Sequence, residues 1–384
     1  MDLTERIDRR RTRNSKHELV VDPDSLNPVV HPTEPVGRET LFEALLDAID
    51  PLFEQAVPPN VYVWGPSGSG KSAIVTALMS ALETKMQSQR PFYAATRGQT
   101  ESDEVEFAYL DARQATSRFQ LYRELLDGLL VDAVPERGMS TDALERKIRS
   151  IQSAGTTVVV AVDHLQESMT ADVGEIHRYF EPFENLAWLG VGRTPPEDVS
   201  LPIPEQQVHV PAYGNELVDT LTVRGSRGLS HTLDHRHAQR LAEWAEGDAH
   251  DALAALYVAA RTAERADATR LRDEDVEAGI DAVPRDGVPI GQVLALSENE
   301  HRILERLLAL ERDGERPIER TAELIAEQTE FTPGTVKRRL YELAQFGVLK
   351  RQEVTVGPGG TGNGRRPSGV TPNFSATLFT LLRE

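Results

Sequence analysis

The chain has 384 residues, a formal net charge of -19 and no cysteine. This length exceeds that of an ordinary single-core domain, so we expect about three folded units. The lack of cysteine excludes disulfides, thiolate zinc sites and thiol catalysis. The sequence contains no apolar run of roughly eighteen residues and no apolar N-terminal stretch like that of a secretory signal, which predicts a cytoplasmic protein with no membrane partner.

Lysine is scarce in this sequence, since only six of the 42 basic residues are Lys. Many carboxylates with few lysines are typical of proteins that work in molar intracellular salt. An ordinary acidic protein from a GC-rich genome is the alternative. We therefore expect a halophilic source.

The first 30 residues contain the basic stretch RIDRRRTRNSK, whose charge is diluted by nearby acidic residues. Such a polar segment cannot bury a core of its own. We expect residues 1–30 to form a disordered or extended basic arm.

The most informative segment is NVYVWGPSGSGKSAIVTALMSAL, which begins at Asn60. Residues 61–64 are predicted to form a buried strand, and a helix is expected from Ala73 onward. The loop between them fits G-x-x-x-x-G-K-S, in which backbone N–H groups and the helix N-terminus surround phosphates; the alternative is a glycine-rich turn with no ligand. Lys71 is expected to reach the outer phosphates and Ser72 to bind Mg²⁺. The predicted nucleotide-binding residues of the loop are Gly65, Pro66, Ser67, Gly68, Ser69, Gly70, Lys71, Ser72 and Ala73.

A second apolar run, TVVVAVD, has the composition of a strand buried on both faces and ends at Asp163. We expect Asp163 to be the second metal-binding residue. The next residue is His164, where many NTPases of this kind have a glutamate that polarises the attacking water. Either the imidazole acts as the base, or hydrolysis is weak or absent.

Further apolar runs are EFAYLD, LAWLGVG and QQVHVP, and helical segments separate them at 119–131 and 141–152. This alternation predicts an α/β unit with a covered parallel sheet over residues 31–211. Residues 212–290 have apolar residues at helical spacing and are predicted to form a helical lid.

A Pro- and Gly-rich link precedes residues 297–384, which we predict to be a winged-helix domain. Thr332 is a plausible N-cap of its recognition helix, and residues 348–356 are expected to begin a hairpin with a basic, glycine-rich tip. Residues 331–383 hold eight basic and two acidic residues, a net charge of +6 within an acidic protein. This island predicts binding of double-stranded DNA, whereas a protein-interaction domain with a solvated loop is the alternative. The predicted DNA contacts are Thr335, Lys337, Arg338, Arg339, Arg365 and Arg366.

With these segments in this order, the chain resembles the archaeal replication initiators related to origin recognition complex subunit one and cell division control protein six. The resemblance covers roughly residues 26–384, including HPTEPVGRETLFEALLDAI, the phosphate loop, VPAYGNELVDTL and EGDAHDALAALYVAARTAER. It implies an AAA+ P-loop NTPase base with a parallel five-stranded sheet, a helical lid and a C-terminal winged helix. ATP or ADP with Mg²⁺ would then lie between base and lid, near Tyr213.

Three positions depart from the pattern that the resemblance implies. His164 follows the acidic strand end, Arg193 follows LGVG where an Asn is usual, and His250 replaces the arginine of the lid motif GDAR. Losing three groups that stabilise charge in phosphoryl transfer predicts nucleotide binding with little turnover, although Arg193 could replace one lost cation.

The leading interpretation is an ATP-binding initiator at origin DNA in the nucleoid, with a replicative helicase or a second initiator as further partners. An ATP-binding winged-helix transcriptional regulator or a partitioning-type switch on DNA is the first alternative. An interaction module with a structural nucleotide is the second.

Overall fold

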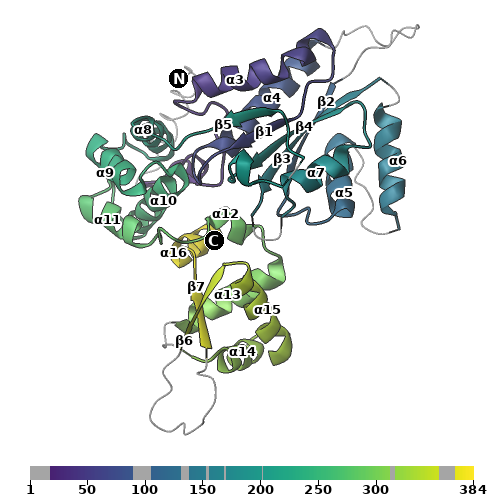
Figure 1. The fold of residues 1–384 in the computed structure, drawn as a ribbon. Coiled ribbons are helices and arrows are strands. Elements are labelled where there is room, and N and C mark those ends of the chain that lie inside the picture. The colour runs from purple at the N-terminus through teal and green to yellow at the C-terminus, as the bar shows by residue number, and fades with distance from the viewer. Residues whose placement is uncertain are drawn as a thin grey trace. The chain divides into compact units, whose positions relative to one another are not determined.

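The computed structural model describes residues 18–89, 105–130, 138–152, 155–167, 170–200, 202–311, 316–353 and 368–384. The chain divides into two compact units, each coloured by chain position in Figure 1. We call Val30–Thr220 with Glu246–Ala249 the sheet unit. We call Met1–Val29, Leu221–Ala245 and His250–Glu384 the helical unit, which contains the expected winged helix and the expected lid except for residues 212–220 and 246–249.

The sheet unit is an α/β unit built on five parallel strands in the order β2-β3-β4-β1-β5. The strands are β1 Val61–Trp64, β2 Val105–Asp111, β3 Thr157–Leu165, β4 Leu186–Gly192 and β5 Gln206–His209. The helices are α3 Glu39–Ile49, η1 Asp50–Glu54, α4 Lys71–Gln89, α5 Arg118–Leu129, α6 Thr141–Gln152, α7 Val173–Phe180 and η2 Pro196–Asp198. The predicted five-stranded parallel sheet is thus confirmed.

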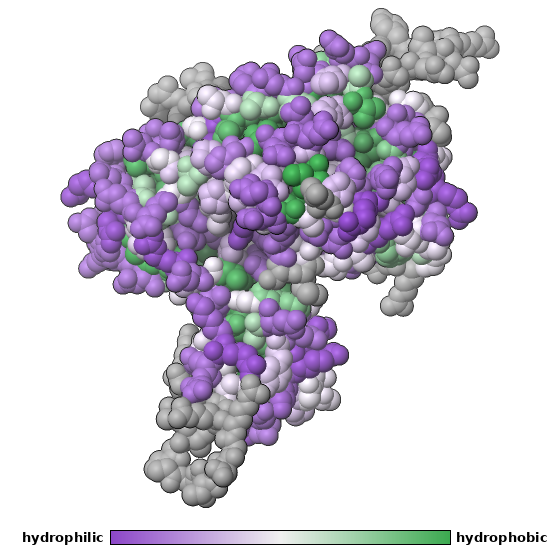
Figure 2. Space-filling view, viewed as in Figure 1, coloured by the Kyte–Doolittle hydropathy of each residue, from purple (hydrophilic) through white to green (hydrophobic). Residues whose placement is uncertain are grey.

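The visible surface of both units is mostly hydrophilic, as Figure 2 shows. The large apolar side chains that are exposed among the described residues are Val30, Phe53, Val57 and Tyr109. Within the same described part of the chain, no helix is both long and apolar enough to cross a bilayer.

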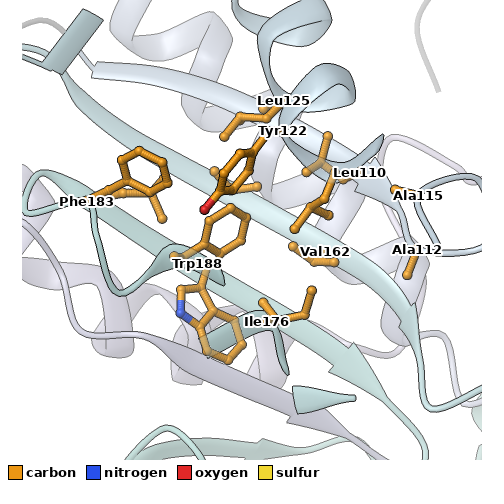
Figure 3. Close-up of a cluster of buried hydrophobic side chains, with 14 of the residues drawn as sticks. Leu110, Ala112, Ala115, Tyr122, Leu125, Val162, Ile176, Phe183 and Trp188 are labelled. Atoms are coloured by element: carbon orange, nitrogen blue, oxygen red, sulfur yellow. The ribbon is translucent and has the colours of Figure 1, made fainter. Parts of the chain in front are cut away.

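Helices cover both faces of the sheet, because the strands are apolar on both faces. In β3, Val158, Val160 and Val162 belong to one buried cluster, and the alternating Val159 and Ala161 belong to the other. The first cluster packs against α5, α6 and α7, with Tyr122 and Trp188 among its largest members (Figure 3). The second packs against α3 and α4. A continuous apolar run is what such a doubly covered strand requires.

Parallel strands bring their carboxyl ends to one edge of the sheet. At this edge β1 leads into the glycine-rich loop, β2 ends at Asp111, and β4 leads into Arg193. The pairing of β3 with β4 shifts between Val162 and Leu165, so the end of β3 carries an irregularity next to Asp163. In open parallel sheets, ligands bind outside this edge.

The described part of the helical unit contains the following elements. They are α2 Pro23–Leu26, α8 Glu216–Gly228 from Leu221 onward, α9 His235–Ala245, α10 Ala249–Arg265, α11 Asp273–Asp281, α12 Ile290–Leu294, α13 Glu298–Glu311, α14 Ile318–Ala326, α15 Pro333–Gln345, β6 Leu349–Glu353, β7 Ser368–Pro372 and α16 Ala376–Leu382.

The described residues of the expected N-terminal arm are folded, which corrects that prediction for residues 18–29. Leu19 and Leu26 are fully buried, and the Arg224 guanidinium donates a hydrogen bond of 2.8 Å to the Asn27 carbonyl. Val20 forms an isolated β-bridge with Leu229. The few apolar residues in this stretch are buried against α8, which composition alone did not indicate. Residues 1–17 lie outside the described part of the chain.

The winged-helix fold combines α13, α14 and α15 with the antiparallel pair β6 and β7. The predicted N-cap at Thr332 is confirmed, because its hydroxyl accepts a hydrogen bond from Thr335 N. At the start of α13, the Glu300 carboxylate accepts a hydrogen bond from Ser297 N. The final helix α16 was not predicted. Its apolar residues pack inward, and Arg383 binds Glu298 at 2.8 Å, which ties the chain end to α13.

Candidate functional site

The predicted phosphate loop runs from the end of β1 to the start of α4, and its glycines are required by its shape. Gly68 and Gly70 have φ values of +60° and +86°, a region that favours glycine. A Cβ atom on Gly70 would lie 2.8 Å from the Tyr213 hydroxyl. Tyr213, predicted as a nucleotide contact, therefore lies against the loop.

Lys71 is held by its own loop. Its Nζ donates to the carbonyls of Gly65 at 2.8 Å and Pro66 at 2.6 Å, and to the Ser69 hydroxyl at 3.2 Å. Burial, together with the nearby Arg193 charge, lowers the pKa of Lys71 to about 8. A phosphate group must compete with the loop carbonyls for this ammonium.

The two predicted metal ligands lie near each other. The Ser72 hydroxyl is close enough to the Asp163 carboxylate to lower its pKa, and Asp163 is 1% exposed. Tyr109, which sequence reasoning missed, donates a 2.5 Å hydrogen bond to Asp163 Oδ2, and His164 N donates to Oδ1 at 2.7 Å. Burial alone would raise the pKa of Asp163, but the His164 charge and these hydrogen bonds hold it below its usual range. A hydroxyl beside an ionised carboxylate is a donor set that fits Mg²⁺, so Ser72 and Asp163 would hold the ion.

His164 lies between two carboxylates. Its Nε2 is 3.8 Å from Asp163 Oδ2, and its Nδ1 is 3.5 Å from Glu167 Oε1. Burial opposes the imidazolium, but the two carboxylates outweigh it and raise the pKa of His164. This environment favours a protonated ring, which cannot take a proton from water, so the geometry argues against the interpretation of His164 as a base.

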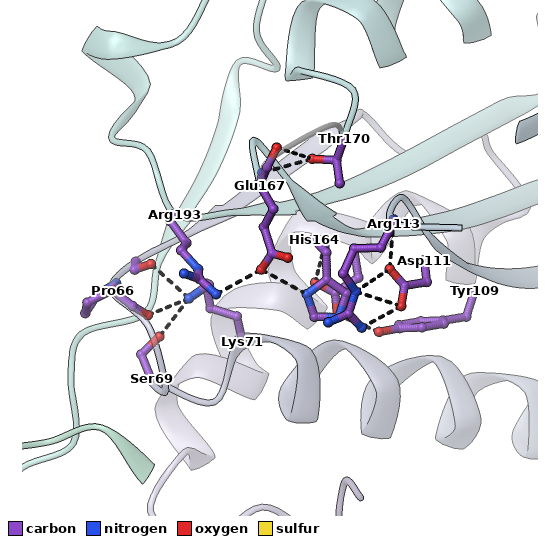
Figure 4. Close-up of polar contacts among 12 residues, drawn as sticks. Pro66, Ser69, Lys71, Tyr109, Asp111, Arg113, His164, Glu167, Thr170 and Arg193 are labelled. Carbon is purple, nitrogen blue, oxygen red and sulfur yellow. Dashed lines mark hydrogen bonds and ion pairs between the residues drawn. The ribbon is translucent and has the colours of Figure 1, made fainter. Parts of the chain in front are cut away.

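Arg193 follows β4 and pairs with Glu167, whose Oε1 accepts a 2.8 Å hydrogen bond from the guanidinium (Figure 4). Glu167 was also missed by sequence reasoning, although it lies only four positions beyond Asp163. Burial would raise the pKa of Glu167, but His164, Arg193 and Arg113 lower it. The carboxylate is therefore ionised.

A second missed pair, Asp111 and Arg113, lies at the end of β2. The guanidinium of Arg113 contacts both Asp111 oxygens, at 2.9 Å from Nε to Oδ1 and 2.5 Å from NH2 to Oδ2. The bidentate pair raises the pKa of Arg113 despite its burial. Both residues could have been predicted as site residues, since they lie at the predicted end of a strand at the ligand edge.

The segment Glu246–Ala249 also contacts the phosphate loop within the sheet unit. Ala249 N donates to the Gly68 carbonyl at 3.0 Å, and a Cβ atom on Gly68 would meet the Asp248 carboxylate at 1.9 Å. His250, the next residue, belongs to the helical unit, where its Nδ1 lies 3.4 Å from Asp251 Oδ1.

The predicted DNA-binding cations on α15 are paired with carboxylates. Lys337 contacts Glu319 at 2.8 Å, and Arg339 contacts Glu342 at 2.9 Å and Glu300 of α13 at 3.5 Å. Arg338 is 66% exposed, and its Nε lies 3.8 Å from Glu342 Oε1. Arg338 is therefore better placed than Arg339 to meet a ligand in solution.

Two further predicted DNA contacts, Arg365 and Arg366, lie outside the described residues. Thr335 is half-buried, and its hydroxyl is 2.9 Å from that of Thr332 in the N-cap.

Comparison with known proteins gives one domain match and several relatives over most of the chain. The AAA ATPase domain family matches residues 34–177. ORC1-type DNA replication protein 1 of Sulfurisphaera tokodaii is 24% identical over 293 residues, 71% of this chain and 69% of that protein. ORC1-type DNA replication protein 11 of Haloarcula marismortui is 22% identical over 370 residues, 90% of this chain and 87% of that protein.

Solved structures share the fold at lower identity. The Aeropyrum pernix ORC1 protein in complex with DNA has a TM-score of 0.62 and 20% identity, covering 94% of this chain and 96% of that one. The Cdc6 protein of Pyrobaculum aerophilum has a TM-score of 0.55 and 16% identity, covering 95% of this chain and 98% of that one. The chain is thus similar in sequence to ORC1-type DNA replication proteins and shares its fold with solved ORC1 and Cdc6 proteins, and the AAA ATPase domain match lies within its sheet unit.

Proposed function

We propose that the chain is an ATP-binding replication initiator that recognises origin DNA through its winged helix and AAA+ module, and that it hydrolyses ATP weakly or not at all. The observation that carries the proposal is the placement of the buried Asp163 carboxylate near Ser72, at the start of the helix that follows the glycine-rich loop, in a chain that also folds into a winged helix.

Nucleotide binding is supported by the geometry at the carboxyl edge of the sheet. The loop supplies backbone N–H groups and Lys71, while Ser72 and Asp163 offer the oxygens that Mg²⁺ prefers. Arg113 and Arg193 add positive charge at the same edge, near the place where a triphosphate would carry its negative charge.

Weak hydrolysis is supported by the surroundings of the residues that follow Asp163. Asp163 and Glu167 raise the pKa of His164, and the carboxylate of Glu167 is paired with Arg193. A general base must have an accessible lone pair within reach of the water it activates. In this arrangement the His164 ring lies between two carboxylates and Arg193 covers Oε1 of Glu167, so either group could accept a proton only after these contacts rearrange.

DNA binding is supported by the exposed cations of α15 and by a relative of the same fold that was solved in complex with DNA. Genome-wide mapping of the DNA retained by the full chain tests the assignment, with Arg338→Ala as the paired variant. Enrichment at one or a few replication origins, lost in the variant, supports initiation. Enrichment at scattered promoters would instead identify a transcriptional regulator and overturn the proposal.

The proposed partners beyond DNA are a replicative helicase or a second initiator. Purification of the chain with crosslinked DNA from cells, followed by identification of co-purified proteins, tests this assignment. Recovery of neither class of replication protein would contradict it.

A further inference from the structure

The backbone after Asp163 turns sharply. His164 and Gln166 have φ values of +62° and +63°, although neither is glycine, and the pairing of β3 with β4 shifts by one residue at this point. Residues other than glycine adopt this conformation where the surrounding structure enforces it, often at functional sites. The consequence is that Glu167 points back toward the ligand edge rather than away from it (Figure 4).

A polar clamp fixes the loops that follow β3 and β4 against each other. The Tyr62 hydroxyl lies 2.7 Å from both Gln166 Oε1 and the Thr194 carbonyl. A Cβ atom on Gly192 would lie 2.6 Å from the Tyr62 hydroxyl, so the lack of a side chain at Gly192 leaves room for this hydroxyl. Since Gln166 and Thr194 are the chain neighbours of Glu167 and Arg193, the clamp also positions that ion pair.

The Glu167 side chain is 6% exposed, and only one of its two carboxylate oxygens has a partner among the described residues. Oε1 accepts the hydrogen bond from Arg193 and lies 3.5 Å from His164 Nδ1. Oε2 is buried and has no hydrogen-bond partner among the described residues. Buried polar atoms nearly always have a hydrogen-bond partner in folded proteins. The unpaired Oε2 therefore indicates that Glu167 has a role beyond its ion pair with Arg193.

The Glu167–Arg193 pair lies within electrostatic range of the phosphate loop. Arg193 lowers the pKa of Lys71, and Glu167 and Asp163 raise it. The carboxylate thus belongs to the same charged cluster as the ammonium expected to meet the outer phosphates. Arg193 remains 41% exposed at its side chain, which leaves the guanidinium room to move.

We propose that Glu167 is the carboxylate that orients and deprotonates the attacking water at this site, and that Arg193 covers it until a γ-phosphate draws the guanidinium away. The inference rests on the proposed nucleotide-binding function. In this inference, Glu167 takes the role of the glutamate that usually follows directly after the strand-end aspartate. The backbone turn brings Glu167 to the site from four positions beyond Asp163.

In the proposed step, the water oxygen forms a bond to the γ-phosphorus while the bond from that phosphorus to the bridging oxygen of ADP breaks. The water proton passes to Glu167 and then to solvent, giving ADP and inorganic phosphate. The negative phosphate oxygens attract Arg193, which uncovers Oε1 of Glu167. Because this exchange must precede chemistry, turnover is slow but depends on Glu167.

Single-turnover hydrolysis of radiolabelled ATP by excess full-length protein tests the inference, together with binding of fluorescent ATP. We expect Glu167→Gln to reduce the hydrolysis rate about a hundredfold, the usual effect of losing a general base, while nucleotide affinity changes by less than about threefold. Glu184→Gln, which changes an exposed acid beyond α7, is the matched control and should hydrolyse ATP at the wild-type rate.

Each of the other possible results overturns either the inference or the proposed function. A Glu167→Gln variant that hydrolyses ATP as fast as the wild type overturns the inference and leaves the proposed function intact. A loss on His164→Gln without a loss on Glu167→Gln overturns it in favour of the imidazole. If the wild-type protein fails to bind the fluorescent nucleotide, the proposed function itself fails.

Discussion

The sheet unit and the winged helix both concentrate positive charge, but they do so in different ways. At the ligand edge, Lys71, Arg113 and Arg193 come from three different loops and lie beside the carboxylates of Asp111, Asp163 and Glu167. On α15, Lys337, Arg338 and Arg339 come from three consecutive positions and contact surface acids.

At the ligand edge, the fold brings charges together from separate segments of the chain. On α15, the charges are neighbours because they occupy consecutive positions in the sequence. Buried ion pairs are screened little and lose much when one partner is removed, whereas exposed pairs contribute little and weaken in salt. Substitutions at the ligand edge should therefore have larger effects than substitutions on α15. Within α15, a comparison of Arg338→Ala with Arg339→Ala should show which cation faces solvent.

The largest effect is expected from Lys71→Ala. Removing the ammonium takes away the charged group nearest the loop carbonyls, and ATP affinity should fall at least about a hundredfold. Equilibrium titration with fluorescent ATP measures the change. Lys85→Ala, on an exposed part of the same helix, serves as the control and should bind as the wild type does. Equal losses in both variants would contradict a specific role for Lys71.

Arg193→Met should have the next largest effect and should discriminate between nucleotides. If the guanidinium moves to the γ-phosphate, its loss weakens ATP binding about tenfold and leaves ADP binding nearly unchanged. Isothermal titration with both nucleotides measures the ratio. An equal loss for ATP and ADP would show that Arg193 does not respond to the third phosphate.

An effect no larger than that of Arg193→Met is expected on DNA from Arg338→Ala. Because this side chain is the most exposed of the three cations on α15, its removal should weaken DNA binding by roughly tenfold at low salt. A lost phosphate contact also reduces the slope of affinity against salt concentration by about one. Fluorescence anisotropy over a series of KCl concentrations measures both, and an unchanged affinity would exclude Arg338 from the interface.

The smallest effect is expected from Arg339→Ala, and it should be on stability rather than on DNA. Arg339 contacts Glu342 and Glu300, so its loss removes a partly exposed ion pair between α15 and α13. Pairs of this kind contribute about 0.5 kcal/mol to the free energy of unfolding. Denaturant unfolding measures the change, and a DNA-binding defect as large as that of Arg338→Ala would reverse the distinction between the two positions.

Much of the fold could be predicted because its signals are local. The central strands β1, β3 and β4 are continuous apolar runs, and the observed β3, Thr157–Leu165, extends the predicted run by two residues. Thr332 and Ser297 cap their helices through hydrogen bonds to residues three positions away. The folded segment at 18–29 and helix α16 were missed. Each has few apolar residues, and these are buried by contacts with other elements that the local sequence does not indicate.

The phosphate loop was predictable for the same reason, since its residues are contiguous and their spacing is the signal. Tyr109, Arg113 and Glu167 were not, because they come from different strand ends. Glu167 in particular reaches the site only through the left-handed turns at His164 and Gln166. No periodicity or motif spacing encodes such a turn in a residue other than glycine.

The amino-acid sequence by itself determined the order of elements, the glycine-rich loop and the placement of basic residues along α15, because each depends on neighbours within a few positions of the chain. The tertiary structure alone decided which charges meet. It paired Glu167 with Arg193 and Arg339 with α13, since these contacts depend on strand register, on a one-residue irregularity in β3 and on which helix face is buried.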